Sequence, residues 1–177
     1  MTDKYILGIE TSCDDTSLAI LKGSPDSLHT RPTMLAQLSF SQEMLLAKWG
    51  GVVPEIAARN HLDKLIPLCR EVFDKAQIKP EQIDLYAVTT HPGLLGPLLT
   101  GLNMAKTFAL YFQKPVRCVN HLYAHLEAIH LTEEVSYPYL GLLVSGGHTL
   151  FVVVESPVNF QILGGTVDDA AGEAFDK

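Results

Sequence analysis

Two histidines four residues apart have the clearest metal-binding spacing in this sequence. His121 and His125 follow a short apolar segment, residues 116–119, that predicts a strand, and Asn120 precedes them as a good helix N-cap. In a helix, residues i and i+4 lie one above the other on one face. Two imidazoles placed in this way can bind a divalent metal, although a stable site needs at least one further ligand. Histidines at this spacing in an arbitrary helix are more often structural.

A turn rich in acids and hydroxyls is the second candidate. Residues 10–16 read Glu-Thr-Ser-Cys-Asp-Asp-Thr and separate two strand-like segments, residues 5–9 and 17–21. Asp14 and Asp15 would then stand at the tip of a hairpin that can meet a phosphate and its metal. Aspartate and serine also favour ordinary turns, so the segment allows both interpretations.

A second hairpin with a small polar turn appears later in the chain. Residues 139–144 and 150–154 are apolar and strand-like, and the turn between them reads Ser-Gly-Gly-His-Thr. This plan repeats that of residues 5–21, so we expect two related lobes whose hairpins face each other across a cleft. Backbone amides in a Ser-Gly-Gly turn can surround an anion, which favours the phosphate interpretation.

The remaining segments supply the elements that must position these residues. We expect a third strand at 34–40, a helix with an apolar stripe around Leu62 to Phe73, a strand at 83–89, a helix at 98–112 and a histidine helix that continues to about residue 131. Pro67 should bend or divide the first of these helices. His61 and His130 are expected to be surface or capping residues. The order predicts a mixed α/β sheet flanked by helices, with parallel strands in its second half.

Composition excludes several classes of protein. The chain has 177 residues, 47% hydrophobic and 19% charged, which is typical of a globular protein. A net charge of −7 argues against strong autonomous binding to nucleic acid, unless other segments or partners supply positive charge. Cys13, Cys69 and Cys118 have no CxxC spacing and indicate free thiols in a reducing cytosol. With no signal-peptide pattern and no long apolar run, we expect a cytoplasmic protein without a membrane span.

Six segments together resemble the TsaD family, whose older names are Gcp glycoprotease and O-sialoglycoprotein endopeptidase. They are residues 9–16 (Ile-Glu-Thr-Ser-Cys-Asp-Asp-Thr), 50–55 (Gly-Gly-Val-Val-Pro-Glu), 92–94 (Pro-Gly-Leu), 120–125 (Asn-His-Leu-Tyr-Ala-His), 143–149 (Leu-Val-Ser-Gly-Gly-His-Thr) and 168–177 (Asp-Asp-Ala-Ala-Gly-Glu-Ala-Phe-Asp-Lys). Each segment alone is a weak signal, but the set in family order is highly specific.

The resemblance implies the actin-like ATPase superfold, with two lobes of ribonuclease-H-like topology. The first lobe would be residues 1–134, and residues 135–177 would begin a second lobe that is incomplete. It also implies a tRNA N6-adenosine threonylcarbamoyltransferase, which moves the threonylcarbamoyl group of threonylcarbamoyl-AMP to N6 of adenosine 37 in tRNAs reading codons that begin with A. The implied partners are tRNA and proteins of the same pathway. Because the unfinished second lobe leaves the apolar strands at 139–154 needing cover, we also expect self-association (a homodimer), domain exchange or disorder near the C-terminus. We expect this segment to be inactive alone.

The resemblance also assigns roles to individual residues. His121 and His125 would bind one Fe(II) or Zn(II) per subunit, with a third ligand, an aspartate, that this chain does not contain. Asp14 and Asp15 would act at the first phosphate hairpin. The adenylate phosphate and carbamoyl region would be lined by Leu143, Val144, Ser145, Gly146 and Gly147, and Asp176 would contact the nucleoside end.

Two other functions stay open at this stage. A metal-dependent glycoprotease is the older assignment of the family, but Leu122 follows His121, so the glutamate base of an HExxH zinc protease is absent. A non-catalytic lobe that keeps the fold and a partner surface is the other alternative.

Overall fold

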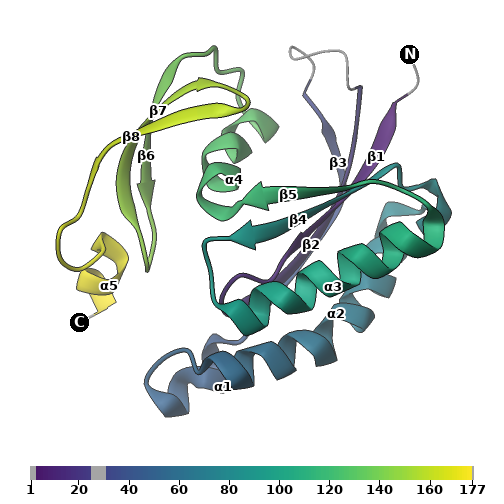
Figure 1. Ribbon diagram of the computed structural model, residues 1–177, viewed down its shortest axis with the longest axis horizontal. Helices are drawn as coiled ribbons and strands as arrows, with labels where there is room; N and C mark the ends of the chain where they lie inside the picture. Colours follow the sequence, from purple (N-terminus) through teal and green to yellow (C-terminus); the bar gives the residue numbers. More distant parts are fainter. Residues whose placement is uncertain (1–2, 25–30, 177) are drawn as a thin grey trace. The chain divides into compact units, whose positions relative to one another are not determined.

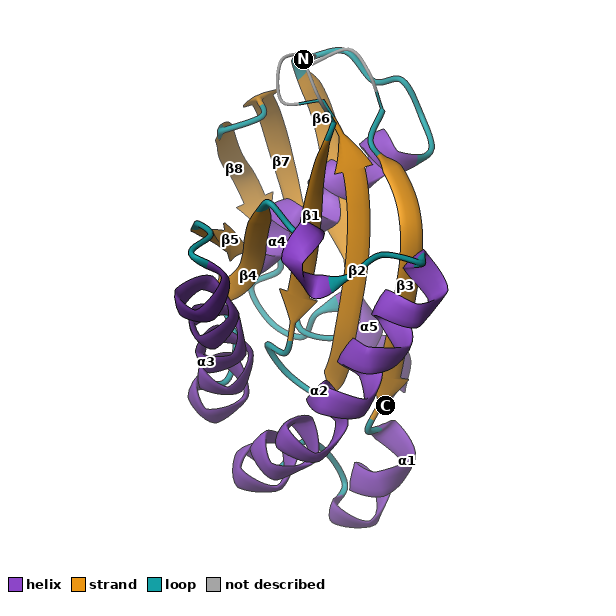
Figure 2. Cartoon of the chain, turned by 90° about the vertical axis from the view of Figure 1, so that its right-hand side faces the viewer, coloured by secondary structure: helices purple, strands orange, loops and turns teal. Residues whose placement is uncertain are grey.

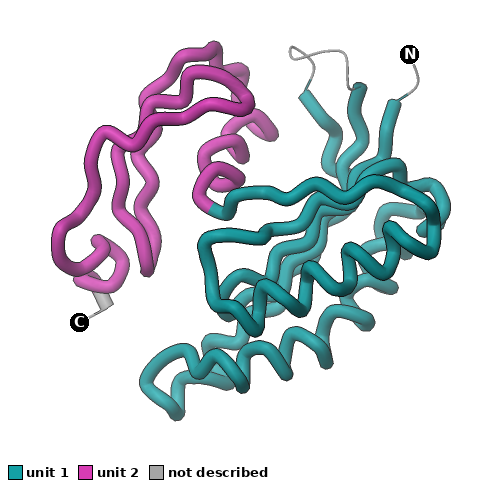
Figure 3. Tube along the Cα trace, in the orientation of Figure 1, with its two compact units in different colours: residues 1–121 teal, residues 122–177 magenta. Residues whose placement is uncertain are grey.

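The computed structural model describes residues 3–24 and 31–176, and these form two compact units (Figure 1). Unit 1 comprises residues 1–121 and unit 2 residues 122–177, coloured separately in Figure 3. Unit 1 contains a five-stranded sheet in the order β3-β2-β1-β4-β5, and unit 2 a three-stranded sheet in the order β6-β7-β8. The expected lobe boundary after residue 134 stays a prediction.

The sheet of unit 1 is mixed. Strands β1 (Lys4–Glu10), β2 (Asp15–Gly23) and β3 (Thr33–Ser41) pair antiparallel in chain order. Strand β4 (Leu85–His91) is parallel to β1, and β5 (Val116–Asn120) is parallel to β4. The predicted hairpin and the predicted parallel second half are therefore confirmed.

Two long helices pack side by side against this sheet. Helix α2 (Pro54–Ala76) contacts β2 and β3, and α3 (Leu95–Phe112) contacts β4. Figure 1 shows both helices running along the same face. Helix α2 continues through Pro67, so this proline does not divide it, and the alternative that it bends the helix stays a prediction. Three short elements complete the unit: α1 (Glu43–Leu46) and the 3-10 turns η1 (Ala47–Trp49) and η2 (Pro80–Gln82).

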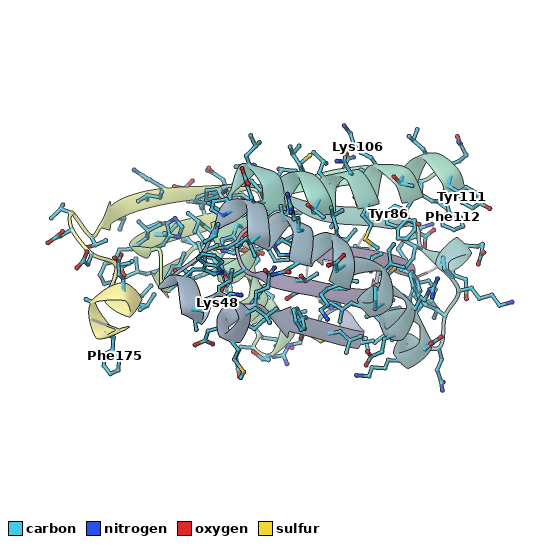
Figure 4. All side chains as sticks on the ribbon, turned by 90° about the horizontal axis from the view of Figure 1, so that it is seen from below. Lys48, Tyr86, Lys106, Tyr111, Phe112 and Phe175 are labelled. Atoms are coloured by element: carbon cyan, nitrogen blue, oxygen red, sulfur yellow. The ribbon has the colours of Figure 1, made fainter. Side chains whose placement is uncertain are left out.

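The core of unit 1 lies between one sheet face and these helices. Because successive strand residues point to opposite faces, every second residue of β1, β2 and β4 is buried. The buried strand residues are Leu7, Ile9, Leu18, Ile20, Tyr86 and Val88, and α2 adds Leu65, Cys69, Val72 and Phe73. The Tyr86 ring centroid lies 5.7 Å from that of Phe108, and the Phe108 centroid lies 6.1 Å from that of Phe112. Figure 4 labels Tyr86 and Phe112 near each other.

Unit 2 is built on an antiparallel sheet. Strands β6 (Tyr139–Val144) and β7 (Thr149–Ser156) form the predicted hairpin. Strand β8 (Asn159–Gly165) pairs with β7 and was not predicted, because its adjacent Ile162 and Leu163 and its terminal glycines break the alternating pattern of a strand. The chain then enters α5 (Ala171–Asp176).

Helix α4 (His121–Glu127) begins directly after β5, at the position that the sequence predicts. It is shorter than expected, because residues 128–131 continue as the 3-10 turn η3 (Ala128–Leu131). Figure 2 shows α4 and the strands from a second side. The boundary between the two compact units falls after the first residue of α4.

The internal repeat is longer than the predicted pair of hairpins. In each unit three successive strands pair antiparallel in chain order, β1-β2-β3 and β6-β7-β8, with a small polar turn between the first two. The expected cleft between the two hairpins stays a prediction.

All three cysteines are free thiols. Within residues 3–24 and 31–176, no helix combines the length and the apolar composition that crossing a bilayer requires.

Candidate active site

His121 is held by two residues from the end of the first strand. Its Nδ1 lies 3.1 Å from Glu10 Oε2 and 3.2 Å from Ser12 Oγ. Strands β1 and β5 are both parallel to β4, so their carboxyl ends meet at one edge of the sheet. This topology brings together Glu10 and His121, which are 111 positions apart in the chain. In α/β sheets such an edge is the usual place for a ligand site.

The charge on Glu10 determines which nitrogen of His121 carries the proton. Burial of the carboxyl raises the pKa of Glu10, but hydrogen bonds from His121, Ser12 and Thr89 outweigh it and lower the pKa to about 2. Glu10 is therefore ionised at neutral pH and accepts a proton donated by Nδ1. Nε2 of His121 is then the nitrogen whose lone pair suits a metal ion, as in carboxylate–histidine–metal arrangements.

The donor set fits part of a metal site. Helix α4 contains both His121 and His125 at the predicted spacing, and borderline metals such as Zn(II) and Fe(II) accept imidazole nitrogen. In the described part of the chain, no group of three histidine, cysteine, aspartate or glutamate side chains could hold an ion. Metal binding by these histidines therefore stays a prediction that needs a third ligand from elsewhere.

The turn that carries Asp14 and Asp15 is held from the side of β4. The Leu94 amide donates to the Ser12 carbonyl at 2.8 Å. Gly93 has φ +157°, and a Cβ there would lie 2.6 Å from the Ser12 carbonyl oxygen, so a side chain does not fit. The Pro-Gly-Leu segment thus packs on the turn. Asp14 is half-buried and Asp15 is exposed.

His61 supports the same turn from α2. Its side chain is fully buried, with Nδ1 2.7 Å from Thr16 Oγ1 and Nε2 3.0 Å from the Cys13 carbonyl oxygen. The prediction that His61 is a surface or capping residue is therefore wrong. Its spacing from Leu65 and Cys69 on the buried stripe of α2 was the signal that could have shown this.

The Ser-Gly-Gly turn of unit 2 is closed by its own ends. The Ser145 amide donates to the His148 carbonyl at 2.8 Å, and the His148 amide donates to Ser145 Oγ at 3.1 Å. Gly146 and Gly147 are exposed, and a Cβ on either would meet no atom within 4 Å. Packing within the chain therefore does not require glycine at these positions, which leaves room for a ligand close to the backbone.

The first turn of α5 docks on this turn. The Ala171 amide donates to Thr149 Oγ1 at 2.8 Å, and the Gly172 amide donates to the Ser145 carbonyl at 3.3 Å. A Cβ on Gly172 would lie 2.7 Å from the Ser145 carbonyl oxygen, so the two backbones approach as closely as they can. Sequence reasoning noted the Asp-Asp-Ala-Ala-Gly segment but did not predict this contact.

Two of the predicted ligand-lining residues, Leu143 and Val144 on β6, differ in burial. Leu143 is buried in the core of unit 2 with Leu126 and Val152, whereas Val144 is exposed. Any ligand contact of Leu143 would therefore come from its backbone. Asp176 is the last residue of α5, and its side chain lies outside the described part of the chain. The roles of these residues stay predictions.

Comparison with known proteins decides the family. The family model TsaD, described as tRNA N6-adenosine threonylcarbamoyltransferase, matches residues 33–177. The chain belongs to the TsaD family. The TsaD segments at residues 9–16, 120–125 and 143–149 are the ones that build the two turns and helix α4.

Individual TsaD relatives cover the whole chain. A tRNA N6-adenosine threonylcarbamoyltransferase of Streptococcus thermophilus is 45% identical over 177 residues, which are 100% of this chain and 50% of the relative. One of Jannaschia sp. is 50% identical over 172 residues, 97% of this chain and 47% of the relative. The chain thus spans about half the length of the curated relatives it matches.

Solved structures confirm the fold class of this TsaD chain. YeaZ from Pseudomonas aeruginosa has a TM-score of 0.55 over 91% of this chain and 65% of that chain, at 17% identity. The predicted actin-like, ribonuclease-H-like fold with a mixed sheet and flanking helices is therefore confirmed.

Proposed function

We propose that the whole protein is a tRNA N6-adenosine threonylcarbamoyltransferase that uses threonylcarbamoyl-AMP to modify adenosine 37 of tRNAs reading codons that begin with A. The observation that carries the proposal is the identity of 45% to 50% with enzymes of that name over essentially this whole chain. The two polar turns and the orientation of His121 by Glu10 support it, since both suit an anionic substrate bound near a metal.

The proposed reaction replaces one bond to the carbamoyl carbon with another. N6 of adenosine attacks this carbon, the C–O bond to the AMP phosphate breaks, and N6 loses a proton. The departing phosphate carries negative charge, which the amides of Gly146 and Gly147 would stabilise because the Ser145–His148 hydrogen bonds fix this turn before the reaction. A bound Fe(II) or Zn(II) on His121 and His125 would polarise the carbamoyl carbonyl or hold the adenylate.

In this mechanism the residues of unit 1 orient groups and do not form a covalent intermediate. Glu10 fixes the ring of His121 and holds the proton on Nδ1. Asp14 and Asp15 would act at the phosphate, where a bound metal ion would offset the repulsion between the carboxylates and the phosphate oxygens. The reaction needs no nucleophilic side chain. Burial raises the pKa of Cys13 to about 11, which keeps that thiol protonated.

Partners are part of the proposal. With a net charge of −7, this chain needs positive charge from the rest of the protein or from partner proteins of the pathway in order to hold tRNA. Exposed apolar side chains on α1 and α2, among them Met44 and Leu62, offer a surface for such a partner or for a second copy. We place the protein in the cytoplasm, where tRNA and reduced thiols occur together.

One incubation separates the transferase from the glycoprotease. The whole protein and its pathway partners are mixed with threonylcarbamoyl-AMP, tRNA and a sialoglycoprotein. We expect the adenylate and tRNA to be consumed and the glycoprotein to stay intact. Cleavage of the glycoprotein with unmodified tRNA would overturn the proposal, and consumption of neither would support the non-catalytic alternative.

A further inference from the structure

We propose that His61 is a positioning residue that fixes the Cys13–Asp14 peptide, so that the Asp14 amide faces outward and can donate to an anionic oxygen of a phosphate. The inference rests on the proposed function for its kinetic readout. Its geometric basis lies entirely within unit 1.

His61 links three parts of unit 1 through one ring. It stands on α2, its Nδ1 lies 2.7 Å from Thr16 Oγ1 at the start of β2, and its Nε2 lies 3.0 Å from the Cys13 carbonyl oxygen in the turn. A carbonyl can only accept, so Nε2 carries the proton and donates. In the neutral ring Nδ1 then accepts from the Thr16 hydroxyl.

The bond to Cys13 determines where the next amide points. The Cys13–Asp14 peptide is trans, and in a planar trans peptide the C=O and N–H bonds point in opposite directions. The Cys13 carbonyl points to the buried His61, so the Asp14 N–H points away from His61. On that side it contacts the Cys13 thiol, a weak acceptor that an anionic phosphate oxygen would displace. An amide turned outward at the tip of a hairpin is a typical donor to a phosphate oxygen.

The electrostatic environment keeps the ring in the required form. Burial lowers the pKa of His61, and this outweighs the opposing effects of the Cys13 carbonyl and of Glu10, Asp14 and Asp15, which raise it. A neutral ring with its one proton on Nε2 satisfies both hydrogen bonds, since Nε2 donates to the Cys13 carbonyl and Nδ1 accepts from the Thr16 hydroxyl.

Besides His61, the Cys13 thiol contacts Asp14 as a weak hydrogen-bond partner, and the stronger restraints on the turn act on Ser12. The Ser12 amide donates to Glu10 Oε1 at 2.5 Å, and the Ser12 carbonyl accepts from the Leu94 amide. These bonds fix Ser12, one position before the peptide that His61 holds. Loss of the His61 bond should therefore free the Cys13–Asp14 peptide to rotate while the rest of the turn stays in place.

A matched pair of amide variants tests the role. In the whole protein, His61→Gln places an amide donor near the position of Nε2, whereas His61→Asn reaches only as far as Nδ1. We expect His61→Gln to keep the KM for threonylcarbamoyl-AMP within about threefold of the wild type and His61→Asn to raise it about tenfold, as for one lost hydrogen bond. Similar melting temperatures of the two variants serve as the folding control. An equal rise of KM in both variants would overturn the proposal.

A second measurement does not depend on catalysis. In nitrogen-edited NMR spectra of the 177-residue chain at pH 7, we expect one ring proton on Nε2 of His61, and an Asp14 amide signal that shifts in His61→Asn more than in His61→Gln. A proton on Nδ1, or equal Asp14 shifts in the two variants, would overturn the positioning role. The proposed function alone would be overturned if the whole wild-type protein failed to modify tRNA while the 177-residue chain showed the expected NMR signals.

Discussion

Glu10 Oε2 lies 3.1 Å from Nδ1 of His121, which joins the end of the first strand to the start of the helix that follows the fifth. The contact gives the first histidine of α4 a fixed orientation and a defined tautomer. A pair of histidines at i and i+4 is common, but a pair whose first ring is oriented by an ionised carboxylate is prepared for a metal.

The metal prediction can be tested through this carboxylate. Replacing Glu10 with Gln removes the charge that holds the proton on Nδ1, and we expect the affinity of the whole protein for zinc to fall about 10-fold to 100-fold. Equilibrium dialysis with zinc measures this, with the exposed Glu43→Gln as the control for a lost surface charge. His121→Ala should remove binding altogether. Unchanged affinity in both Glu10→Gln and His121→Ala would contradict a metal site on α4.

Stability should depend on pH through His61. Since burial lowers its pKa in the folded state, the unfolded chain takes up a proton first as the pH falls below the ordinary value of about 6.5. The stability that His61 contributes is therefore complete above about pH 6.5 and is lost as the pH falls through the lowered folded-state pKa. Urea unfolding at several pH values should show the wild type losing free energy of unfolding relative to His61→Gln, which cannot titrate there. A constant difference between pH 8 and pH 5 would rule this out.

Gly172 should be sensitive to a single methyl group. In Gly172→Ala the new Cβ would meet backbone atoms of Ser145 and Gly146 at 2.7 to 2.9 Å, and backbone cannot move aside as a side-chain end can. We expect a loss of about 1–3 kcal/mol in the free energy of unfolding, measured by denaturant titration. Gly164→Ala, whose Cβ would meet no atom within 4 Å, is the matched control. Equal losses in the two variants would show that the contact with the turn does not matter.

Gly146 should behave in the opposite way. Its Cβ would enter open space, so we expect Gly146→Ala to unfold within about 0.5 kcal/mol of the wild type. If the turn receives the adenylate phosphate, the same methyl group should lower kcat/KM for threonylcarbamoyl-AMP at least about tenfold, since it occupies ligand space. Stability by denaturant titration and transfer kinetics are measured on the same variant. Full activity would place the ligand elsewhere.

The strands were predictable because apolar segments bounded by small polar turns indicate β-hairpins without knowledge of the rest of the fold. The contact between Glu10 and His121 was not, because it depends on β1 and β5 ending at the same sheet edge, which only the pairing order determines. His61 was misjudged because residue type was given more weight than its position on the buried stripe of α2. The close approach of Gly172 to Ser145 is a tertiary contact between the first turn of α5 and the β6–β7 turn, and no local pattern reports it.

The most direct test of the central claim is mass spectrometry of nucleosides from tRNA that was incubated with the whole protein, its partners and threonylcarbamoyl-AMP. The Streptococcus thermophilus relative, assayed with its own partners, is the positive control. The account predicts threonylcarbamoyladenosine at position 37 of tRNAs that read codons beginning with A. Unmodified adenosine at this position, in an assay where the relative modifies the same tRNA, would contradict it.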